Sequence, residues 1–304
     1  MSYHYYTADV FTNEVFQGAQ IAVFPEAENF DKSLMARIAR ELNLSETVFV
    51  SKTDNANNFR LKVYSPKGEI DFAGHPILAT AKALVRSGQI DPAYDSAVCF
   101  EQNTGAVAVN IRQQEAQPLF VQFEISVQAI VDRYTPTAAE LAHFLGIEAR
   151  EIDTHRFQTR LVSVDRPYLI VPLLSQEAVR RARFSMEAWS QSSAPGMAAQ
   201  EIFLFSGRTS ERDTDFHGRL LGPNIGANED PPIGSVMPSF GAYLGEHEDV
   251  REGTYTFTID RGTRDGRRSV LSIEADYHPN KPVKLRVGGE VVLVAECQLL
   301  LETP

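Results

Sequence analysis

The sequence predicts an α+β protein of two related, pseudo-symmetric halves, each a curved, mostly antiparallel sheet wrapped around one central helix. Short strand patterns outnumber helical patterns along the 304 residues. Two predicted helices carry almost no charge: residues 76–85 contain only Lys82, and residues 233–245 contain no charged side chain. A helix that is apolar on all faces must be surrounded by protein. Each of these two helices is therefore expected at the centre of a sheet.

A degenerate repeat is the third observation that predicts two halves. The four matched pairs lie 157, 157, 158 and 160 residues apart, and they are Phe59 and Phe216, Pro66 and Pro223, Gly68 and Gly226, and Gly74 and Gly234. Each copy ends in a glycine and a small polar residue, His75 or Ser235, at the start of an uncharged helix. Chance similarity is the alternative to duplication. We expect a first half at residues 1–126 with 290–304 added, a second half at 127–289, and an active site in the cleft between them.

The elements of the first half follow from local patterns. Apolar residues at helical spacing after Asp31, a suitable N-cap, predict an amphipathic helix over residues 31–42. Alternation of apolar and basic residues predicts a strand over 59–63. Pro76 suits the first turn of the uncharged helix, and Gly88 suits its end. Residues 106–111 and 119–125 are predicted strands, and 126–137 is the expected boundary between the halves.

The second half repeats this alternation of short strands and helices. A helix is predicted over residues 136–144, capped by Thr135 and stopped at Gly146. Strands are predicted over 161–164, 255–259, 270–273 and 291–294. Gly245 suits the end of the second uncharged helix.

Composition limits the kinds of partner and compartment. A net charge of −11 and a pI near 5.2 argue against nucleic-acid or anionic-membrane partners, because there is no basic excess to neutralise phosphates. The N-terminus shows no signal-peptide pattern, and no apolar run approaches the roughly 20 residues of a membrane span. Cys99 and Cys297 lie far apart without metal-ligand spacing. We therefore expect a reduced, cytoplasmic protein without a metal site.

Two residues of the first half are candidates for proton transfer. Glu46 lies where a helix gives way to a strand, beside Val48 and Phe49, where partial desolvation would raise its pKa. The alternative is that Glu46 only ends the helix or faces solvent. His75 opens a helix, where the dipole and burial would lower its pKa and keep the ring neutral. The alternative is that His75 is a structural cap or a core histidine. A metal site is not expected, because no second His, Cys or carboxylate lies at helix-face spacing from His75.

The loop before the second uncharged helix is a candidate anion site. Asp230 precedes that helix, and Gly234 and Ser235 open it, so the Ser235 hydroxyl and N–H could both face an anion. A structural Asp-Pro turn with a serine cap is the alternative. The glycines match neither a dinucleotide nor a P-loop fingerprint, so no nucleotide cofactor is expected.

Three motifs together resemble the PhzF-like family of phenazine biosynthesis isomerases and epimerases. They are Asn43-Leu44-Ser45-Glu46, Phe72-Ala73-Gly74-His75-Pro76 and Glu229-Asp230-Pro231-Pro232-Ile233-Gly234-Ser235. The resemblance implies a diaminopimelate-epimerase-like fold, no cofactor and a possible homodimer. It also implies Glu46 as the acid/base, with His75, Asp230 and Ser235 assisting and Gly74 and Gly234 lining the substrate site.

The chain departs from the family pattern beside the expected pocket. Ala19 stands where the family usually has asparagine, and Pro232 and Ile233 replace its common Ala-Thr. These departures bear on the identity of the substrate. Fold relatives that epimerise amino acids place a cysteine before each helix-opening glycine, whereas this chain has Ala73 and Ile233 there. A two-thiol mechanism is therefore not expected.

Three functions remain open at this point. The first is a cofactor-independent isomerase that moves a proton between carbons of a small carboxylated cyclic or amino-acid-like substrate. The second is a non-catalytic relative that binds a small molecule, and the third is an epimerase with carboxylate and histidine as opposed bases. Glu46, His75, Asp230 and Ser235 occurring together favours an enzyme.

Overall fold

The computed structural model describes residues 2–55, 57–71, 74–94, 97–113, 117–226, 230–247, 250–263 and 266–301. Contacts divide the chain into two compact units. Unit 1 comprises Met1–Ile125, Thr263–Leu271 and Arg286–Pro304, and unit 2 comprises Ser126–Gly262 and Ser272–Leu285. Residues 263–271 were expected in the second half, but they belong to unit 1. Arg267 explains this, because its side chain donates to the carbonyls of Gln17 and Gly18 at 3.0 Å each and pairs with Asp9.

Unit 1 is built on a closed eight-stranded barrel. Its strands pair in the order β1-β2-β3-β4-β6-β7-β8-β16, and β16 pairs back with β1 to close the ring. The strand bounds are β1 Ser2–Val10, β2 Ala19–Phe24, β3 Glu46–Lys52, β4 Asn58–Ser65, β6 Ala97–Gln102, β7 Gly105–Arg112, β8 Leu119–Val127 and β16 Val283–Leu300, with the short β5 Gly68–Ile70 beside β4. Along β7, buried and exposed residues alternate, as expected of a sheet with one face in the core.

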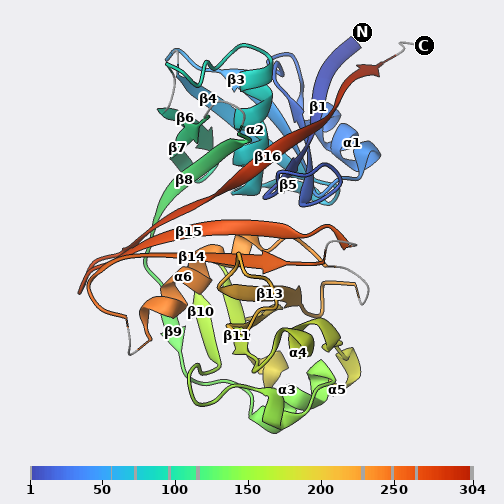
Figure 1. Cartoon of the computed structure of the whole chain (residues 1–304). Coiled ribbons are helices and arrows are strands. Elements are labelled where there is room, and N and C mark those ends of the chain that lie inside the picture. Colours follow the sequence, from blue (N-terminus) through green and yellow to red (C-terminus); the bar gives the residue numbers. More distant parts are fainter. Residues whose placement is uncertain are drawn as a thin grey trace. The chain divides into compact units, whose positions relative to one another are not determined.

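Two helices cover the two faces of this barrel wall. Helix α2 (His75–Arg86) is buried over residues 75–81 and 83–84 and packs on β1, β2 and β3, and Figure 1 shows it among the strands of unit 1. Helix α1 (Lys32–Leu42) packs its apolar face on the aromatic side chains of Phe24, Phe49 and Tyr64. The expected N-cap is confirmed, since Asp31 accepts a hydrogen bond from the Leu34 amide at 2.8 Å. The central-helix arrangement is thus present in unit 1.

Unit 2 contains a second curved sheet with its own buried helix. The strands pair in the order β9-β10-β11-β12-β13-β14-β15. Their bounds are β9 Ile130–Asp132, β10 Arg160–Ser163, β11 Pro167–Pro172, β12 Glu201–Ser206, β13 Phe216–Leu221, β14 Gly253–Arg261 and β15 Ser269–Tyr277. The helices are α3 Ala138–Leu145, α4 Gln176–Arg181, α5 Met186–Ser190 and α6 Met237–Gly245, with 3₁₀ turns η1 Ala149–Glu151, η2 Ala194–Gly196 and η3 Gly234–Val236.

The two faces of the unit 2 sheet have different coverings. On the face toward α6, the Phe240 ring makes edge-to-face contacts with Phe203, Phe205 and Phe216. On the other face, Ile202 and Leu204 join the core formed by α3, α4 and α5, which Figure 1 shows grouped together in green and yellow. Alternation along β12 therefore sends successive side chains to two separate cores.

The two units repeat the same order of strand pairings. In unit 1, β2 is parallel to β3, β3 antiparallel to β4, and β4 parallel to β6 after α2. In unit 2, β11, β12, β13 and β14 pair in the same senses, with α6 in the place of α2. The register partners Arg60 and Glu101 are hydrogen-bonded at 2.7 Å, and so are His217 and Asp260. His217 lies 157 residues after Arg60, which matches the sequence repeat. These pairings support duplication over chance similarity.

Two predicted helix starts were wrong. Helix α3 is capped by Thr137, not Thr135, because Thr137 and Glu140 form a reciprocal capping box. The second uncharged helix was predicted from residue 233, but the α-helix starts at Met237. Gly234–Val236 form a 3₁₀ turn instead, in which the Val236 amide bonds to the Ile233 carbonyl at 3.2 Å. None of the described helices is long and apolar enough to cross a membrane.

Candidate active site

Glu46 is the first residue of β3 and follows α1 after a short connection. Asn43 ends α1 in the left-handed conformation, with φ of 49°, and turns the chain toward the strand. Glu46 then pairs in register with Ile21 of β2. Its side chain is 13% exposed, so the carboxylate is largely removed from water.

His75 is the first residue of α2, and its ring meets Glu46. The distance from His75 Nε2 to Glu46 Oε2 is 2.8 Å, and the histidine side chain is only 6% exposed. A neutral histidine nitrogen can donate to a carboxylate or accept from a carboxylic acid. The pair can therefore hold one proton in either arrangement. The other nitrogen, Nδ1, is buried and has no hydrogen-bond partner among the described residues.

Gly74 precedes His75, and packing explains why a glycine stands there. Its backbone is right-handed, with φ of −78°, so no conformational argument requires glycine. A Cβ at this position would lie 2.5 Å from Cζ of Phe123, far inside van der Waals contact. Gly74 therefore lets the start of α2 approach the ring of Phe123, and so sets the position of His75.

In unit 2, Asp230 is held by a buried arginine. Arg261 Nη1 donates to the Asp230 carbonyl at 2.7 Å and to its Oδ2 at 3.1 Å, and the Arg261 side chain is 5% exposed. Asp230 Oδ1 is buried without a hydrogen-bond partner among the described residues. Sequence reasoning missed Arg261, although the charged pair Asp260-Arg261 directly after the predicted strand 255–259 is a signal that could have found it.

Gly234 and Ser235 lie in the 3₁₀ turn that precedes α6. Gly234 and the neighbouring Ile233 are buried, while Ser235 is half-buried. Tyr168 of β11 was also missed from the sequence; burial raises the pKa of its phenol, and its interaction with Ser235 opposes this rise. Its residue pattern is that of an ordinary buried strand, so no sequence signal marked it. Glu46, Gly74 and His75 thus meet in unit 1, and Asp230, Gly234 and Ser235 belong to unit 2.

Some motif residues fall outside the described residues. They are Phe72 and Ala73 of the second motif and Glu229 of the third. Cys99 and Cys297 are unpaired, half-buried thiols. Burial raises the pKa of the Cys99 thiol, which disfavours its thiolate. Across the described ranges, no three His, Cys, Asp or Glu side chains are grouped as metal ligands.

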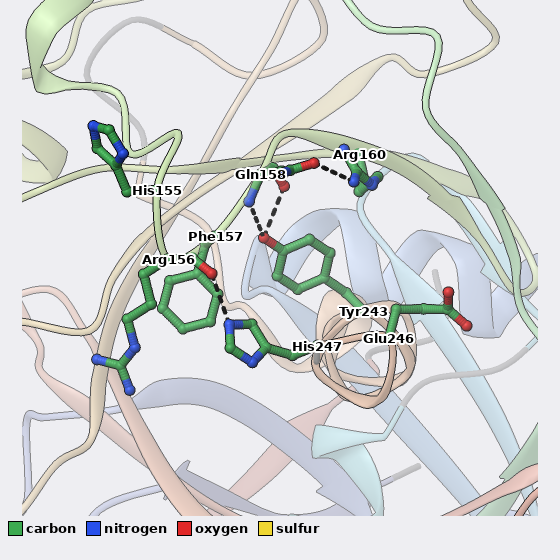
Figure 2. Close-up of a pocket in the computed structure, with 8 residues that line it drawn as sticks. All are labelled: His155, Arg156, Phe157, Gln158, Arg160, Tyr243, Glu246 and His247. Atoms are coloured by element: carbon green, nitrogen blue, oxygen red, sulfur yellow. Dashed lines mark hydrogen bonds between the residues drawn. The ribbon is translucent and has the colours of Figure 1, made fainter. Parts of the chain in front are cut away.

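A cavity of about 200 Å³ lies at the C-terminal end of α6, and Figure 2 shows its lining residues. They are His155, Arg156, Phe157, Gln158, Arg160, Tyr243, Glu246 and His247. Several of its polar groups bond to one another: the Tyr243 hydroxyl donates to the Gln158 carbonyl at 2.8 Å, and His247 Nε2 donates to the Arg156 carbonyl at 2.7 Å. Ser235 lies at the opposite end of this helix. The cavity therefore contains none of the predicted site residues.

Comparisons with known proteins agree on one family. The family model described as phenazine biosynthesis-like protein, PhzC-PhzF, matches residues 8–297. An uncharacterized isomerase of Mesorhizobium japonicum is 29% identical over 98% of this chain and 99% of its own. The trans-2,3-dihydro-3-hydroxyanthranilate isomerase of Pseudomonas chlororaphis is 27% identical over 98% of this chain and 100% of its own.

A solved structure shows the same fold. The PhzF-family phenazine biosynthesis protein of Bacillus anthracis has a TM-score of 0.87 and 19% identity, and the match covers 99% of this chain and 100% of that one. Together with the motifs around Glu46, His75 and Ser235, these matches place the chain in the phenazine biosynthesis-like protein family, as an enzyme of the isomerase class.

Proposed function

We propose that the protein is a cofactor-independent isomerase that moves a proton between two carbons of a small, carboxylated cyclic or amino-acid-like substrate. Glu46 is the acid/base in this proposal. The observation that carries it is the 2.8 Å hydrogen bond between Glu46 and His75, with both side chains largely buried. Enzymes commonly use such a desolvated, hydrogen-bonded carboxylate for proton transfer.

The proposed reaction needs no oxidant and no second substrate. The Glu46 carboxylate takes a proton from one substrate carbon, and the bonding electrons stay in the substrate and shift its double bond. The resulting carboxylic acid then returns the proton to another carbon. His75 stabilises both forms of Glu46 if its Nε2–H donates to Oε2 of the carboxylate, because the proton from the substrate can then go to the other oxygen, Oε1, and leave this hydrogen bond in place. Exclusion of water keeps the proton on Glu46 between the two steps.

The other family residues are proposed to bind the substrate. Ser235 would donate a hydrogen bond to its anionic group, and Asp230, fixed by Arg261, would contact a polar substituent. Gly234 would let the substrate approach the backbone closely, and Gly74 would line the site with its backbone, since the Phe123 ring fills the space of a Cβ there. Replacing each side chain separately and measuring KM and kcat tests these roles, since substrate contacts change KM while a lost proton carrier changes kcat.

An epimerase that uses Glu46 and His75 as opposed bases is the weaker candidate. Bases on opposite faces of a substrate carbon must have that carbon between them, so they cannot be hydrogen-bonded to each other. The direct contact of Glu46 and His75 favours one proton-carrying centre. A non-catalytic binding relative is disfavoured because a binding protein has no need to bury an acid/base pair.

Incubation with trans-2,3-dihydro-3-hydroxyanthranilate in D₂O, followed by NMR, tests the proposal. An isomerase produces a product with a relocated double bond. An epimerase gives deuterium at a single stereocentre without a new double bond, and a binding protein leaves the compound unchanged. A parallel incubation with smaller unsaturated ring carboxylates tests the substrate class. The proposal fails if no compound in either set gains a relocated double bond.

A further inference from the structure

We propose that Phe11 is a positioning residue for His75, whose contact with the imidazole keeps Nε2 of that ring on the Glu46 carboxylate. The inference rests on the proposed function, in which His75 supports Glu46, and it adds the group that fixes the orientation of His75. Phe11 is the first residue of the loop 11–18, which joins β1 to β2. All of the residues involved belong to unit 1.

The ring of Phe11 lies against the ring of His75 inside the protein. The two ring centroids are 6.5 Å apart, and the planes meet at 49°, which is within the range of aromatic contacts. Both residues are buried. On the backbone side, the ring of Phe123 already limits how Gly74 and the start of α2 can be placed. Phe11 adds a contact to the side chain itself, and so restricts the rotation of the imidazole.

Phe11 has an uncommon backbone conformation that its neighbours hold in place. Its φ of 63° lies in the left-handed region, which bulky residues rarely occupy. The Phe11 carbonyl accepts from the Val270 amide at 2.8 Å, and the Thr12 amide donates to the Glu290 carbonyl at 3.1 Å. A Cβ on Gly289 would lie 2.6 Å from Cδ1 of Phe11, so the phenyl ring fills the space beside that glycine. Such strain persists where the surroundings over-determine it, often at functional sites.

A buried ion pair holds the rest of the loop. The Asp9 side chain is 1% exposed, pairs with Arg267 and accepts a hydrogen bond from the Phe16 amide at 2.7 Å. Arg267 also donates to two loop carbonyls, one of them that of Gly18, at 3.0 Å each. Burial raises the pKa of the Asp9 carboxyl, and the Arg267 guanidinium opposes this rise. Since Asp9 lies two residues before Phe11 and Gly18 ends the loop, the ion pair fixes both ends of the segment that begins with Phe11.

The hydrogen bonds of His75 favour one orientation and one tautomer. Nε2 lies 2.8 Å from Glu46 Oε2, whereas Nδ1 is buried and has no partner among the described residues. A hydrogen on Nδ1 would be a buried donor without an acceptor, but a hydrogen on Nε2 is donated to the carboxylate. The Phe11 ring has no polar atom that could compete for either nitrogen. Held in this way, His75 donates to Oε2 and leaves Oε1 of Glu46 for the proton from the substrate.

NMR of the protein with ¹⁵N-labelled histidine rings tests the inference without requiring turnover. At about pH 8, where an ordinary histidine is neutral, His75 of the parent should carry its hydrogen on Nε2 and none on Nδ1. His75→Gln identifies these signals by their absence. Phe11→Ala should populate the second tautomer, because water can then reach Nδ1, and both nitrogens should shift toward intermediate values. Phe11→Leu keeps much of the volume and should fall between the parent and Phe11→Ala.

Kinetics supply a second measurement, with the compound that the parent converts. Phe11→Ala should lower kcat about 10–100-fold, as expected when a substitution away from the chemistry displaces a reacting group. KM should stay within about twofold, because Phe11 is not proposed to touch the substrate. Arg267→Lys keeps the positive charge beside Asp9 but loses the planar fork that binds the loop. It should change kcat and the His75 signals in the same direction as Phe11→Ala, by a smaller amount.

Phe30→Ala is the matched control. Phe30 is also buried in unit 1, where its ring packs on Phe24 and Phe49 in the core that α1 covers. Both alanine variants remove a buried ring, so both should lower the melting temperature. Phe30→Ala should leave the His75 signals and the kcat of the folded protein unchanged. A purely structural role for Phe11 predicts this same result for Phe11→Ala.

The outcomes separate this inference from the proposed function. If His75→Gln keeps the kcat of the parent, the proposed support of Glu46 by His75 fails. If His75→Gln loses activity but Phe11→Ala keeps the tautomer of the parent, or lowers kcat no more than Phe30→Ala does, only the positioning role fails. Equal populations of the two tautomers in the parent would also overturn the inference. If Phe11→Ala does not fold, the same comparisons with Phe11→Leu decide. The role of Glu46 as proton carrier is not touched by these results.

Discussion

Glu46 and His75 are 29 residues apart in sequence, yet their side chains meet at 2.8 Å in unit 1. The contact depends on three local features. Asn43 turns the chain out of α1, Ile21 fixes the register of Glu46 in the sheet, and Gly74 lets α2 begin against Phe123. The Glu46–His75 contact is therefore a product of how β3 and α2 are packed, and changes at these supports should disturb it.

Glu46→Gln should fold normally and lose turnover by about 10²–10⁴-fold, because the amide keeps the shape of the carboxylate but cannot carry a proton. The measurement compares kcat of the variant with kcat of the parent, for the compound that the parent converts in the D₂O assay. Glu41→Gln, at an exposed position of α1, removes the same charge and should leave kcat unchanged. Activity of Glu46→Gln within a fewfold of the parent would exclude Glu46 as the proton carrier.

Gly74→Ala should destabilise the protein by about 1–3 kcal/mol, because the new methyl group overpacks against Phe123. It should also lower activity, since His75 must shift with the helix start. Gly196→Ala is the control, because nothing lies within 4 Å of a Cβ there. The double variant Gly74→Ala/Phe123→Leu should recover part of the lost stability, because leucine is smaller than phenylalanine and leaves room for the new methyl group. Equal unfolding free energies for Gly74→Ala and the parent in urea would contradict the packing argument.

Cys99→Ala and Cys297→Ala, combined, should leave activity within about twofold of the parent. Neither thiol precedes a helix-opening glycine, and burial already raises the pKa of Cys99, so it is a poor thiolate base. Inactivation of the parent by iodoacetamide, with protection by substrate, would argue for a catalytic thiol instead.

Glu140 gives a prediction for stability against pH. Hydrogen bonds from the Thr137 amide, and next from the Ser193 amide, lower the pKa of Glu140 from 4.5 to about 2. A depressed carboxyl pKa stabilises the folded state above the unfolded-state value, and this contribution is lost as the pH falls. Glu140→Gln should therefore melt at a lower temperature than the parent at pH 7. The difference should shrink below pH 4.5 and vanish near pH 2; a difference independent of pH would contradict this assignment.

Local sequence patterns were enough to predict much of the fold. The burial of α2 and α6 was predicted from their lack of charged residues, and the strand β4 was predicted from the alternation of apolar and basic residues. Helix starts were harder, since Thr135 and Thr137 are both good caps and only the partner at Glu140 selects the second. The start of α6 depends on a 3₁₀ turn that periodicity does not distinguish from the first turn of an α-helix.

The candidate site residues that belong to sequence motifs could be predicted, whereas those that tertiary packing brings to the site could not. Glu46, His75, Asp230 and Ser235 came from motifs. Arg261 and Tyr168 come from strands far away in sequence, and only the parallel register of β11 with β12 brings Tyr168 level with Glu201. Residue type and spacing along the chain do not show that Arg261 contacts Asp230 or that Tyr168 pairs in register with Glu201.

The most direct test of Glu46 as a single proton carrier follows one labelled hydrogen. The test compound, trans-2,3-dihydro-3-hydroxyanthranilate, would carry deuterium at the carbon that loses its hydrogen, and a single turnover would be run in ordinary water. If one carboxylate takes and returns the same hydrogen in a site closed to water, the product should carry deuterium at the receiving carbon, which NMR detects. Product with solvent hydrogen alone at that carbon, and all of the deuterium in the water, would contradict transfer by Glu46 within a closed site.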